Sequence, residues 1–598
     1  MLIRKGFLLA VSLCVSVAVF AQSDEDAAKA RREKLNAILT GSLAEVQELR
    51  LPENRAVFYA RIGNLTWPQD QKRARALFRN AAAELTAAQD LAESKRAVNP
   101  YNELLQGSST RQQILNIIAL RDAELALTML ASTRPANVQR AMDAPSDRSQ
   151  KISSFQQNNA YLAQNELSME QNFYRMAAEQ SPERAVKILK QSLSKGLTND
   201  TFSQLERLAQ KDAAVAAEMA TQVVDKLLRS NYMLEEQPNY VDIQLTNSIL
   251  SYHIARKNDD SQKLKFEDGQ MQSLAAKFVN AYISDQRIAG SIGQSITNIA
   301  EKLRPGSLEQ IKKVNARMYR QNGSHDTDAA YQKMMNGETP VEEMLASAEK
   351  FPVSSRRQIY QTASNRLLSE GNWQAARNVI TENFASDDGE QALTNFDQQL
   401  FYNLVGQRKY TEAENVADGL PEQHRVSLLV YLANSMFSLD PKENRASAAA
   451  ILGKARQLVS EKPQNSNEMG QLMQIVNGYG QLDPPEAIRL FEGVIPKLTE
   501  LTDAAAVLNG FQVNSNVRDG EFLITNGSPL DQFGGNSYML ASFAKTDIEK
   551  TVSLIDAFKR PEIRILLKLQ LLDGSDLNWS PITGTTITQL PILHRRVQ

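Results

Sequence analysis

Apolar residues recur at three- and four-residue spacing along most of this chain, and many of the runs begin with the same polar signal. Asp440-Pro441 precedes one such run and Asp483-Pro484 precedes another. An Asp side chain can accept hydrogen bonds from the free amides at a helix start, and proline in the first turn loses no hydrogen bond there. The pattern therefore predicts helices that each bury one apolar stripe.

A second kind of helix start also repeats, at Leu51-Pro52, Leu420-Pro421 and Arg560-Pro561. The first two lead through one helix length to a turn and a second helix rich in Ala and Arg. Gly and Pro together number 27 + 20 = 47 of 598 residues, which is low for a globular protein. We expect pairs of antiparallel helices, with more than about two-thirds of the chain helical against an average near one-third.

The length of the chain bears on how these helices are organised. A single apolar core stops growing near ~250–300 residues, so 598 residues form several domains or an open array. The predicted fold is all-α: an α-solenoid of helical hairpins, with an N-terminal repeat region at 22–320 and a C-terminal one at 341–572. A polar stretch, Asn322 to Asp328, predicts a break within 321–340.

Two turns near the middle of the C-terminal region have the same pattern. They are Gly371-Asn372-Trp373-Gln374-Ala375-Ala376 and, with Arg in the Gly position, Arg408-Lys409-Tyr410-Thr411-Glu412-Ala413. The pattern resembles the Gly-x-aromatic-x-x-Ala turn of tetratricopeptide repeats, and the spacing of 410 − 373 = 37 is close to that family's period of ~34. The later aromatic and the closing Pro of the family pattern are missing.

The resemblance covers about seventy residues and implies an α-solenoid that binds a peptide or protein in a concave groove. It also implies that Trp373, Ala376, Tyr410 and Ala413 are structural repeat positions. We expect Trp373 and Tyr410 to pack within their hairpins and not to contact a ligand.

One long interruption of the helical pattern, 509–536, is rich in Gly, Asn and Asp. It nevertheless keeps Phe522, Leu523, Ile524 and Phe533, whose exposure to water is unfavourable. Two interpretations stay open: a candidate interaction loop, or a loop that folds onto neighbouring helices. Phe522 to Ile524 could form a short strand, and the tail at 573–598 is predicted to be irregular.

The N-terminus, Met1 to Ala21, has the anatomy of a signal peptide. Arg4 and Lys5 precede an apolar run too short for an ordinary membrane span. We therefore expect the protein to be exported and to be periplasmic or secreted. The lone cysteine, Cys14, lies inside this segment, so the mature chain is expected to be free of cysteine.

Charge and chemistry narrow the function mostly by exclusion. The 67 basic and 69 acidic residues give a net charge of −2 without a basic run, which argues against nucleic acid as a partner. The four histidines are scattered, and no later segment is long and apolar enough to span a membrane. No catalytic residue, cofactor site or metal site is predicted.

The sequence thus predicts an exported helical-repeat scaffold for protein–protein interaction, with the cell envelope as one setting and an unidentified protein or peptide as partner. A secreted (α/α)-toroid carbohydrate-active enzyme with paired carboxylates is one alternative. The chain has three Trp, and we expect Trp67 and Trp373 to pack at hairpin turns instead of serving as sugar platforms. A self-associating structural protein is the other alternative.

Overall fold

The computed structural model confirms the all-α class, since it is 82% helical. It describes residues 29–94, 100–143, 154–181, 187, 190–191, 193, 196–234, 237–256, 264–292, 295–321, 327–384, 386–510, 517–524 and 537–574. The predicted signal peptide and nearly all of the predicted tail lie outside these ranges. Within the described residues, no helix combines the length and hydropathy that crossing a bilayer requires.

The chain forms two compact units, and their boundaries differ from the expected division. One unit contains residues up to 111 and from 341 onward, and the other contains residues 112–340. The stretch expected as one region, 22–320, is therefore divided, because its first hairpin packs with the C-terminal helices. Of the expected break at 321–340, residues 322–326 lie outside the described ranges, and the helix α16 (Thr327–Met335) occupies part of the rest.

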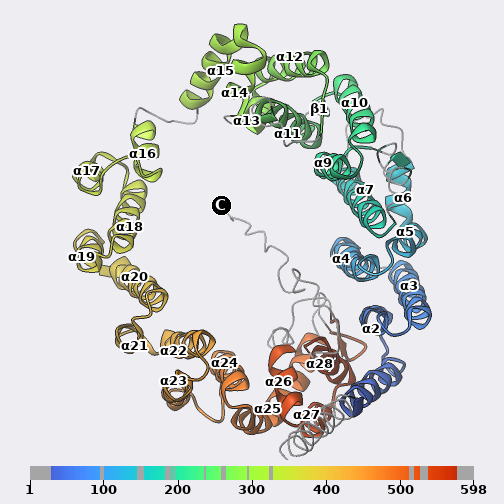
Figure 1. The fold of residues 1–598 in the computed structure, drawn as a ribbon, viewed down its shortest axis with the longest axis vertical. Helices are drawn as coiled ribbons and strands as arrows, with labels where there is room; N and C mark the ends of the chain where they lie inside the picture. Colours follow the sequence, from blue (N-terminus) through green and yellow to red (C-terminus); the bar gives the residue numbers. More distant parts are fainter. Residues whose placement is uncertain are drawn as a thin grey trace, which may run out of the picture. The chain divides into compact units, whose positions relative to one another are not determined.

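In the C-terminal part of the first unit, helical hairpins follow one another in two rows (Figure 1). The first helices of the hairpins are α18 (Val353–Ser369), α20 (Ser386–Gly406), α22 (Glu422–Leu439) and α24 (Ser466–Leu482). The second helices are α19 (Trp373–Asn383), α21 (Tyr410–Asp418), α23 (Arg445–Gln457) and α25 (Pro484–Gly510). Each second helix packs against the first helix of its own hairpin, and α19, α21 and α23 also pack against the first helix of the next.

A buried alanine occupies the fourth position of these second helices. Its amide donates to the carbonyl of the residue before the helix, and its side chain is 0% exposed at Ala376, Ala413, Ala448 and Ala487. The same arrangement recurs at Ala74, Ala126 and Ala216. A methyl group lets two helix axes approach closely, so a cap followed four residues later by Ala is the local rule of the repeat.

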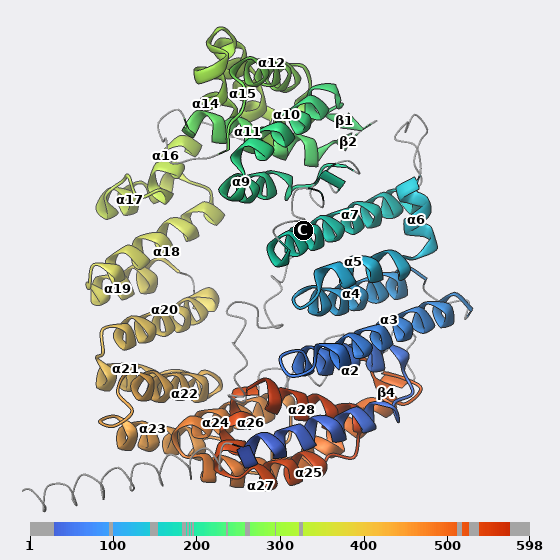
Figure 2. The same ribbon diagram turned by 45° about the vertical axis from the view of Figure 1, so that its right-hand side comes forward.

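The remaining elements of the first unit bring the two ends of the described chain together. They are helical residues 29–46, α2 (Pro52–Thr66), α3 (Gln71–Ser94), α17 (Val341–Ser347), η3 (Ala348–Lys350), β3 (Val517–Arg518), β4 (Glu521–Phe522), α26 (Ser537–Thr546), α27 (Ile548–Asp556) and α28 (Pro561–Asp573). Helix α2 packs on both α3 and α28 (Figure 2). Arg61 pairs with Asp573 at 2.9 Å and Arg564 with Glu45 at 3.2 Å.

The second unit is also helical, and α4 (Pro100–Ala119) begins before its boundary. Its other elements are α5 (Ala123–Ser132), α6 (Ala136–Asp143), α7 (Ser154–Gln180), α9 (Thr201–Lys211), α10 (Ala213–Arg229), β1 (Met233–Leu234), β2 (Gln237–Pro238), α11 (Tyr240–Arg256), α12 (Asp268–Ser284), α13 (Gln286–Ile292), α14 (Ser295–Leu303), η2 (Pro305–Ser307), α15 (Leu308–Gln321) and α16. A continuous apolar core runs from Ala178 to Ile311.

The helix starts agree with the sequence patterns, with one exception. Asp483 accepts from the amide of Glu486 at the start of α25, as expected. Asp440 instead accepts from the amides of Lys442 and Glu443 in a turn, and α23 begins only at Arg445. The carboxylate stabilises a tight turn there, because a side chain that bonds the next amides competes with helix formation.

Candidate functional site

The predicted interaction loop contains a small β-hairpin. Strands β3 and β4 pair antiparallel, with Val517 opposite Phe522. The two residues between them, Asp519 and Gly520, have φ values of 48° and 79°. Positive φ at both positions is the backbone of the two-residue hairpin turn that Asp-Gly favours.

This hairpin is part of the core, which corrects the interaction-loop interpretation for its apolar residues. Phe522 is 0% exposed and Leu523 is 3% exposed, while Ile524 is half-buried. Strand β3 packs on α25, and the Arg560 guanidinium lies 5.2 Å from the Phe522 ring. Packing removes these groups from water, which is why a polar loop retains them. Phe533, the fourth residue of the candidate loop, lies outside the described residues.

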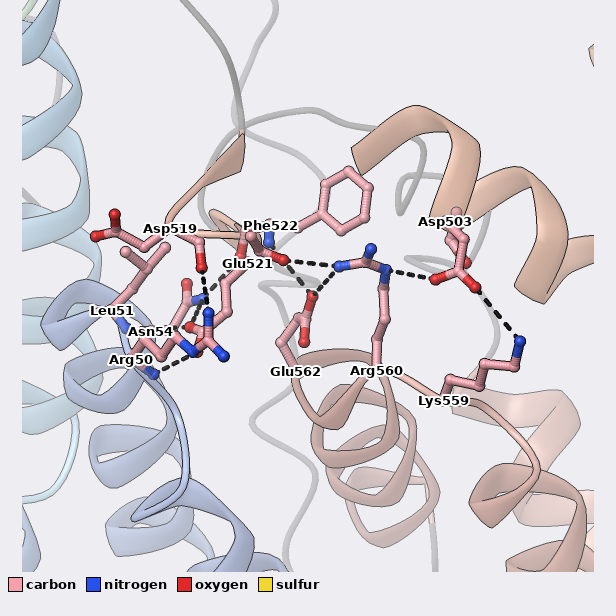
Figure 3. A network of polar contacts seen from close by, with 12 residues as sticks. Arg50, Leu51, Asn54, Asp503, Asp519, Glu521, Phe522, Lys559, Arg560 and Glu562 are labelled. Carbon is pink, nitrogen blue, oxygen red and sulfur yellow. Dashed lines mark hydrogen bonds and ion pairs between the residues drawn. The ribbon is translucent and has the colours of Figure 1, made fainter. Parts of the chain in front are cut away.

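Glu521 directly precedes Phe522 in β4. Its carboxylate caps the start of α2, at Leu51, which is 470 residues away in sequence (Figure 3). One oxygen accepts from the backbone amide of Arg50 and the other from that of Leu51 at 3.1 Å. These amides stand at the start of α2, which has no cap from its own N-cap side chain. A negative charge at a helix N-terminus also interacts favourably with the helix dipole.

The side-chain amide of Asn54 holds the same hairpin from α2. Its nitrogen donates to the carbonyl of Phe522 at 2.7 Å, and its oxygen accepts from the amide of Ile524 at 3.1 Å. Asn54 is 1% exposed. One amide group thus binds an extended stretch of main chain through both its donor and its acceptor.

A second buried carboxylate, Glu562, closes the network from α28. It is 1% exposed and accepts from the amide of Phe522 at 3.3 Å and from Arg560 at 3.5 Å. Arg560 also bonds Asp503 at 3.1 Å (Figure 3). Burial raises the pKa of the Glu562 carboxyl, against the lowering effects of its amide partners and of Arg560, and the nearby Glu521 raises it further.

We call this set the junction; it comprises Arg50, Leu51, Asn54, Glu521, Phe522, Arg560 and Glu562. Its two carboxylates are engaged by main-chain amides and an arginine, so the geometry is that of a structural connection. In the other unit, Arg134 pairs with Glu166 at 2.8 Å and with Glu170 at 3.8 Å. Among the described residues, no group of three His, Cys, Asp or Glu could hold a metal.

The turns of the tetratricopeptide-like pattern share one backbone conformation. Gly371 has φ 84° and Arg408, its counterpart, has φ 62°. In both, the amide at that position and the next one bond back to carbonyls of the preceding helix, at 2.9 to 3.1 Å. Gly337 and Glu338 make the same two bonds, 34 residues before Gly371 (371 − 337). This left-handed helix ending is favourable for glycine and strained for arginine.

The side chains of these turns depart from the expectation in one respect. Ala376 and Ala413 are fully buried and Tyr410 is half-buried, but Trp373 is 46% exposed. Trp373 is the first residue of α19, whose buried residues, Ala376, Val379 and Ile380, begin one turn later. The expectation of a buried Trp373 was wrong. Trp67, in contrast, stacks on Phe78 with ring centroids 6.0 Å apart.

The first helices of three adjacent hairpins present a surface that the sequence analysis missed. Within the described parts of α20, α22 and α24, the exposed positions at 391–402, 423–431 and 467–481 carry no charge. They form a stripe of side-chain amides, hydroxyls and tyrosines at helical spacing, joined by the half-buried Gln471. We call this surface the amide stripe; it comprises Gln391, Asn395, Gln399, Tyr402, Gln423, Ser427, Tyr431, Asn467, Gln471, Gln474 and Gln481.

Contacts between helices show that these positions share one surface. Tyr402 of α20 meets Tyr431 of α22 edge to face, with ring centroids 5.0 Å apart. The Ser427 hydroxyl donates to Gln474 of α24 at 2.8 Å. Tyr402 and Tyr431 are 47% and 46% exposed, and both rings pack on the buried Phe401. Each tyrosine ring thus packs on Phe401 and leaves nearly half of its surface exposed to solvent.

The second helices of the same hairpins expose a different chemistry. Their exposed positions include acids and bases on α21, α23 and α25, among them Glu412, Asp418, Arg445, Lys454, Arg489 and Glu492. The uncharged exposed positions therefore lie on α20, α22 and α24, although the row of first helices also exposes Arg357 on α18, Glu390 on α20 and Glu422 on α22. A sequence signal existed: polar uncharged residues recur every three or four positions from Gln391 to Tyr402.

Comparisons with known proteins do not place the chain in a family. No family model matches it, and no curated protein is similar to it at a significant level. Among solved structures it is similar to a circular tandem repeat protein described as having a novel repeat topology and enhanced subunit contact surfaces. The two share 13% identity over 90% of this chain and 99% of that one, with a TM-score of 0.14.

Proposed function

We propose that this protein is an exported helical-repeat scaffold that binds another protein on the amide stripe. The observation that carries the proposal is the pair of half-exposed tyrosines, Tyr402 and Tyr431, within an uncharged surface. The cores of protein interfaces are depleted of charged residues and enriched in aromatic ones, with Tyr frequent among the residues that dominate binding energy. Tyrosine beside Ser and Asn is also the composition of many antibody paratopes.

Site-specific cross-linking tests this proposal. A photoreactive phenylalanine analogue is placed at Tyr402 or Tyr431 in cells that make the protein, and the adducts are identified by mass spectrometry. The same analogue at Trp373 is the control, because Trp373 is 46% exposed yet lies on a second helix. We expect the same partner at both tyrosine positions and not at Trp373. Identical adducts at all three positions, or none, would contradict the proposal.

Export rests on the sequence of Met1 to Ala21, with its short basic start and apolar run. We expect the mature protein to begin near Gln22. N-terminal sequencing of protein from the exported fraction checks this, and a chain that retains residues before Phe20 would show that the segment is not removed.

Self-association is a second candidate function, favoured by an exposed apolar face at the end of α25. Leu501, Val507 and Leu508 are 41%, 61% and 69% exposed. Leu501 and Leu508 are seven residues apart, so they lie on the same side of the helix. Sedimentation velocity over a range of concentrations tests this, with Leu508→Glu expected to abolish any self-association.

A further inference from the structure

The positions of the amide stripe offer hydrogen bonds and ring surface but no charge, and the exposed Glu390 and Glu422 lie one residue before its first positions on α20 and α22. A partner that placed a charged side chain on it would lose hydration without meeting an opposite charge. Each Gln or Asn side chain offers both a donor and an acceptor, as does a main-chain peptide group. The chemistry of the stripe therefore favours an uncharged segment that is held through its main chain.

The protein already uses side-chain amides in this way inside its own fold. Asn54 holds β4 through a carbonyl and an amide of the main chain. Gln180 donates to the carbonyl of Ala119 and accepts from the amide of Ala123, both at 2.9 Å. In both places the side-chain amide makes its hydrogen bonds to the protein's own main chain. On α20, α22 and α24 the amides of the stripe are exposed, apart from the half-buried Gln471. Some of them also bond each other or a neighbouring helix, as Gln391 does to Asn395 and Gln474 to Ser427.

Helix α22 packs on both α20 and α24, so the usual spacing of packed helices selects among extended conformations. Packed helices lie 8–10 Å apart. A β-strand repeats the same face about every 6.7 Å, which does not match this spacing. A polyproline II helix has three residues per turn and a rise of ~3.1 Å, so its face repeats about every 9 Å. A segment in that conformation could present the same face to α20, α22 and α24 in turn.

The tyrosine pair fits the same conformation. Proline-rich segments dock on aromatic surfaces, and proline has no amide hydrogen, so its carbonyl oxygens take hydrogen bonds from the receptor. Tyrosine hydroxyls and glutamine amides supply such donors. We infer that the partner of the amide stripe is an uncharged, proline-rich polypeptide segment in the polyproline II conformation. This inference rests on the proposed function, because it names the partner of the same surface.

Calorimetric titration of the full exported chain tests the inference with three probes. The first is a synthetic peptide of about twelve residues that repeats Pro-Pro-Ala, which is about four polyproline II turns. The second is a flexible Gly-Ser-Ala peptide of equal length, and the third is a neutral linear oligosaccharide. We expect binding of the first probe only, with an affinity that changes little between about 0.05 and 0.5 M salt, because no charges are paired.

Variants place the binding on the stripe. Replacing both Tyr402 and Tyr431 by Ala should weaken binding at least about tenfold, as loss of central aromatic contacts does. Replacing both by Phe should weaken it less, because the rings remain while the hydroxyl donors are lost. Trp373→Ala should bind as the unaltered protein does. Circular dichroism melting of each variant confirms that the fold is retained.

The possible failures are distinguishable. If no proline-rich peptide binds while cross-links at Tyr402 and Tyr431 persist, the partner class is overturned and the scaffold function stands. Equal binding of the Gly-Ser-Ala peptide would also overturn the conformation inferred here. Tyrosine-dependent binding of the oligosaccharide would overturn the polypeptide partner. Absence of cross-links together with absence of binding would overturn the proposed function itself.

Discussion

The junction and the amide stripe use the same chemistry with opposite outcomes. At the junction, a side-chain amide and an aromatic ring, Asn54 and Phe522, are 1% and 0% exposed, and Asn54 bonds the hairpin's main chain. On the stripe, Gln399 is exposed three residues before Tyr402, which is 47% exposed. Groups that satisfy each other add stability, whereas groups that face water remain available to a partner. Residue type alone therefore does not separate structural from binding positions; burial does.

The comparison predicts its largest effect for the aromatic rings. Phe522→Ala should lower the free energy of unfolding by about 3–5 kcal/mol, because it empties a fully buried site. Tyr431→Ala should lower it by less than about 1 kcal/mol, since surface changes are usually small. Urea denaturation of both variants measures the difference. Similar losses for the two would show that the tyrosine is as structural as the phenylalanine.

The second-largest effect on stability is expected for the Glu521 carboxylate, which caps α2. Glu521→Ala leaves the amides of Arg50 and Leu51 without their acceptor and should cost about 3 kcal/mol, since each buried unsatisfied group costs about 1–3 kcal/mol. Glu521→Gln retains one acceptor oxygen and should cost less. Thermal melting checks the order of the three proteins. An unchanged melting temperature for Glu521→Ala would show that α2 does not depend on this cap.

The two equivalent turns predict opposite and smaller effects. Gly371 and Arg408 both have positive φ, and a side chain in that conformation costs roughly 1–2 kcal/mol. Gly371→Ala should therefore destabilise the protein by about 1 kcal/mol, and Arg408→Gly should stabilise it by a similar amount. A Cβ at Gly371 would meet no atom within 4 Å, so only backbone strain is tested. Equal signs for the two variants would contradict the equivalence of the turns.

The smallest expected effect concerns pH. Burial raises the pKa of Glu562 in the folded protein. The folded protein then binds more protons than the unfolded chain once the pH exceeds the ordinary carboxyl pKa, so its free energy of unfolding falls as the pH rises through that window. Glu562→Gln should remove this decline. Urea denaturation between about pH 4 and 8 compares the slopes; parallel slopes would mean that the carboxyl does not titrate differently on folding.

Local features of the fold could be predicted from the sequence. The proline-led starts at Pro52 and Pro561 open α2 and α28, and Asp519-Gly520 forms the turn of the short hairpin. These features depend on a few neighbouring residues, whose backbone preferences are readable. A structural role for Ala376 and Ala413 was also predicted, from the resemblance to a repeat family, and both are fully buried.

Long-range features could not be predicted in the same way. Nothing near Glu521 indicates that its carboxylate bonds the start of α2, because that contact depends on how distant helices pack. The exposed Trp373 was missed because the family pattern gives the residue type but not the direction of a side chain at a helix end. The amide stripe was not predicted because the spacing of apolar residues, from which the helices were predicted, says nothing about which polar residues lie on the exposed face.

The cap on α2 has a consequence for how the protein is made. The amide of Leu51 leaves the ribosome long before Glu521, which follows 470 residues later. At ~5–20 residues per second, synthesis of that interval takes roughly 25 to 95 s. During this time the start of α2 has no partner and α28 does not yet exist, so the first hairpin must wait in an incomplete state. A chain cut short before the hairpin at 517–522 would carry that state permanently, because the carboxylate that caps α2 would never be made.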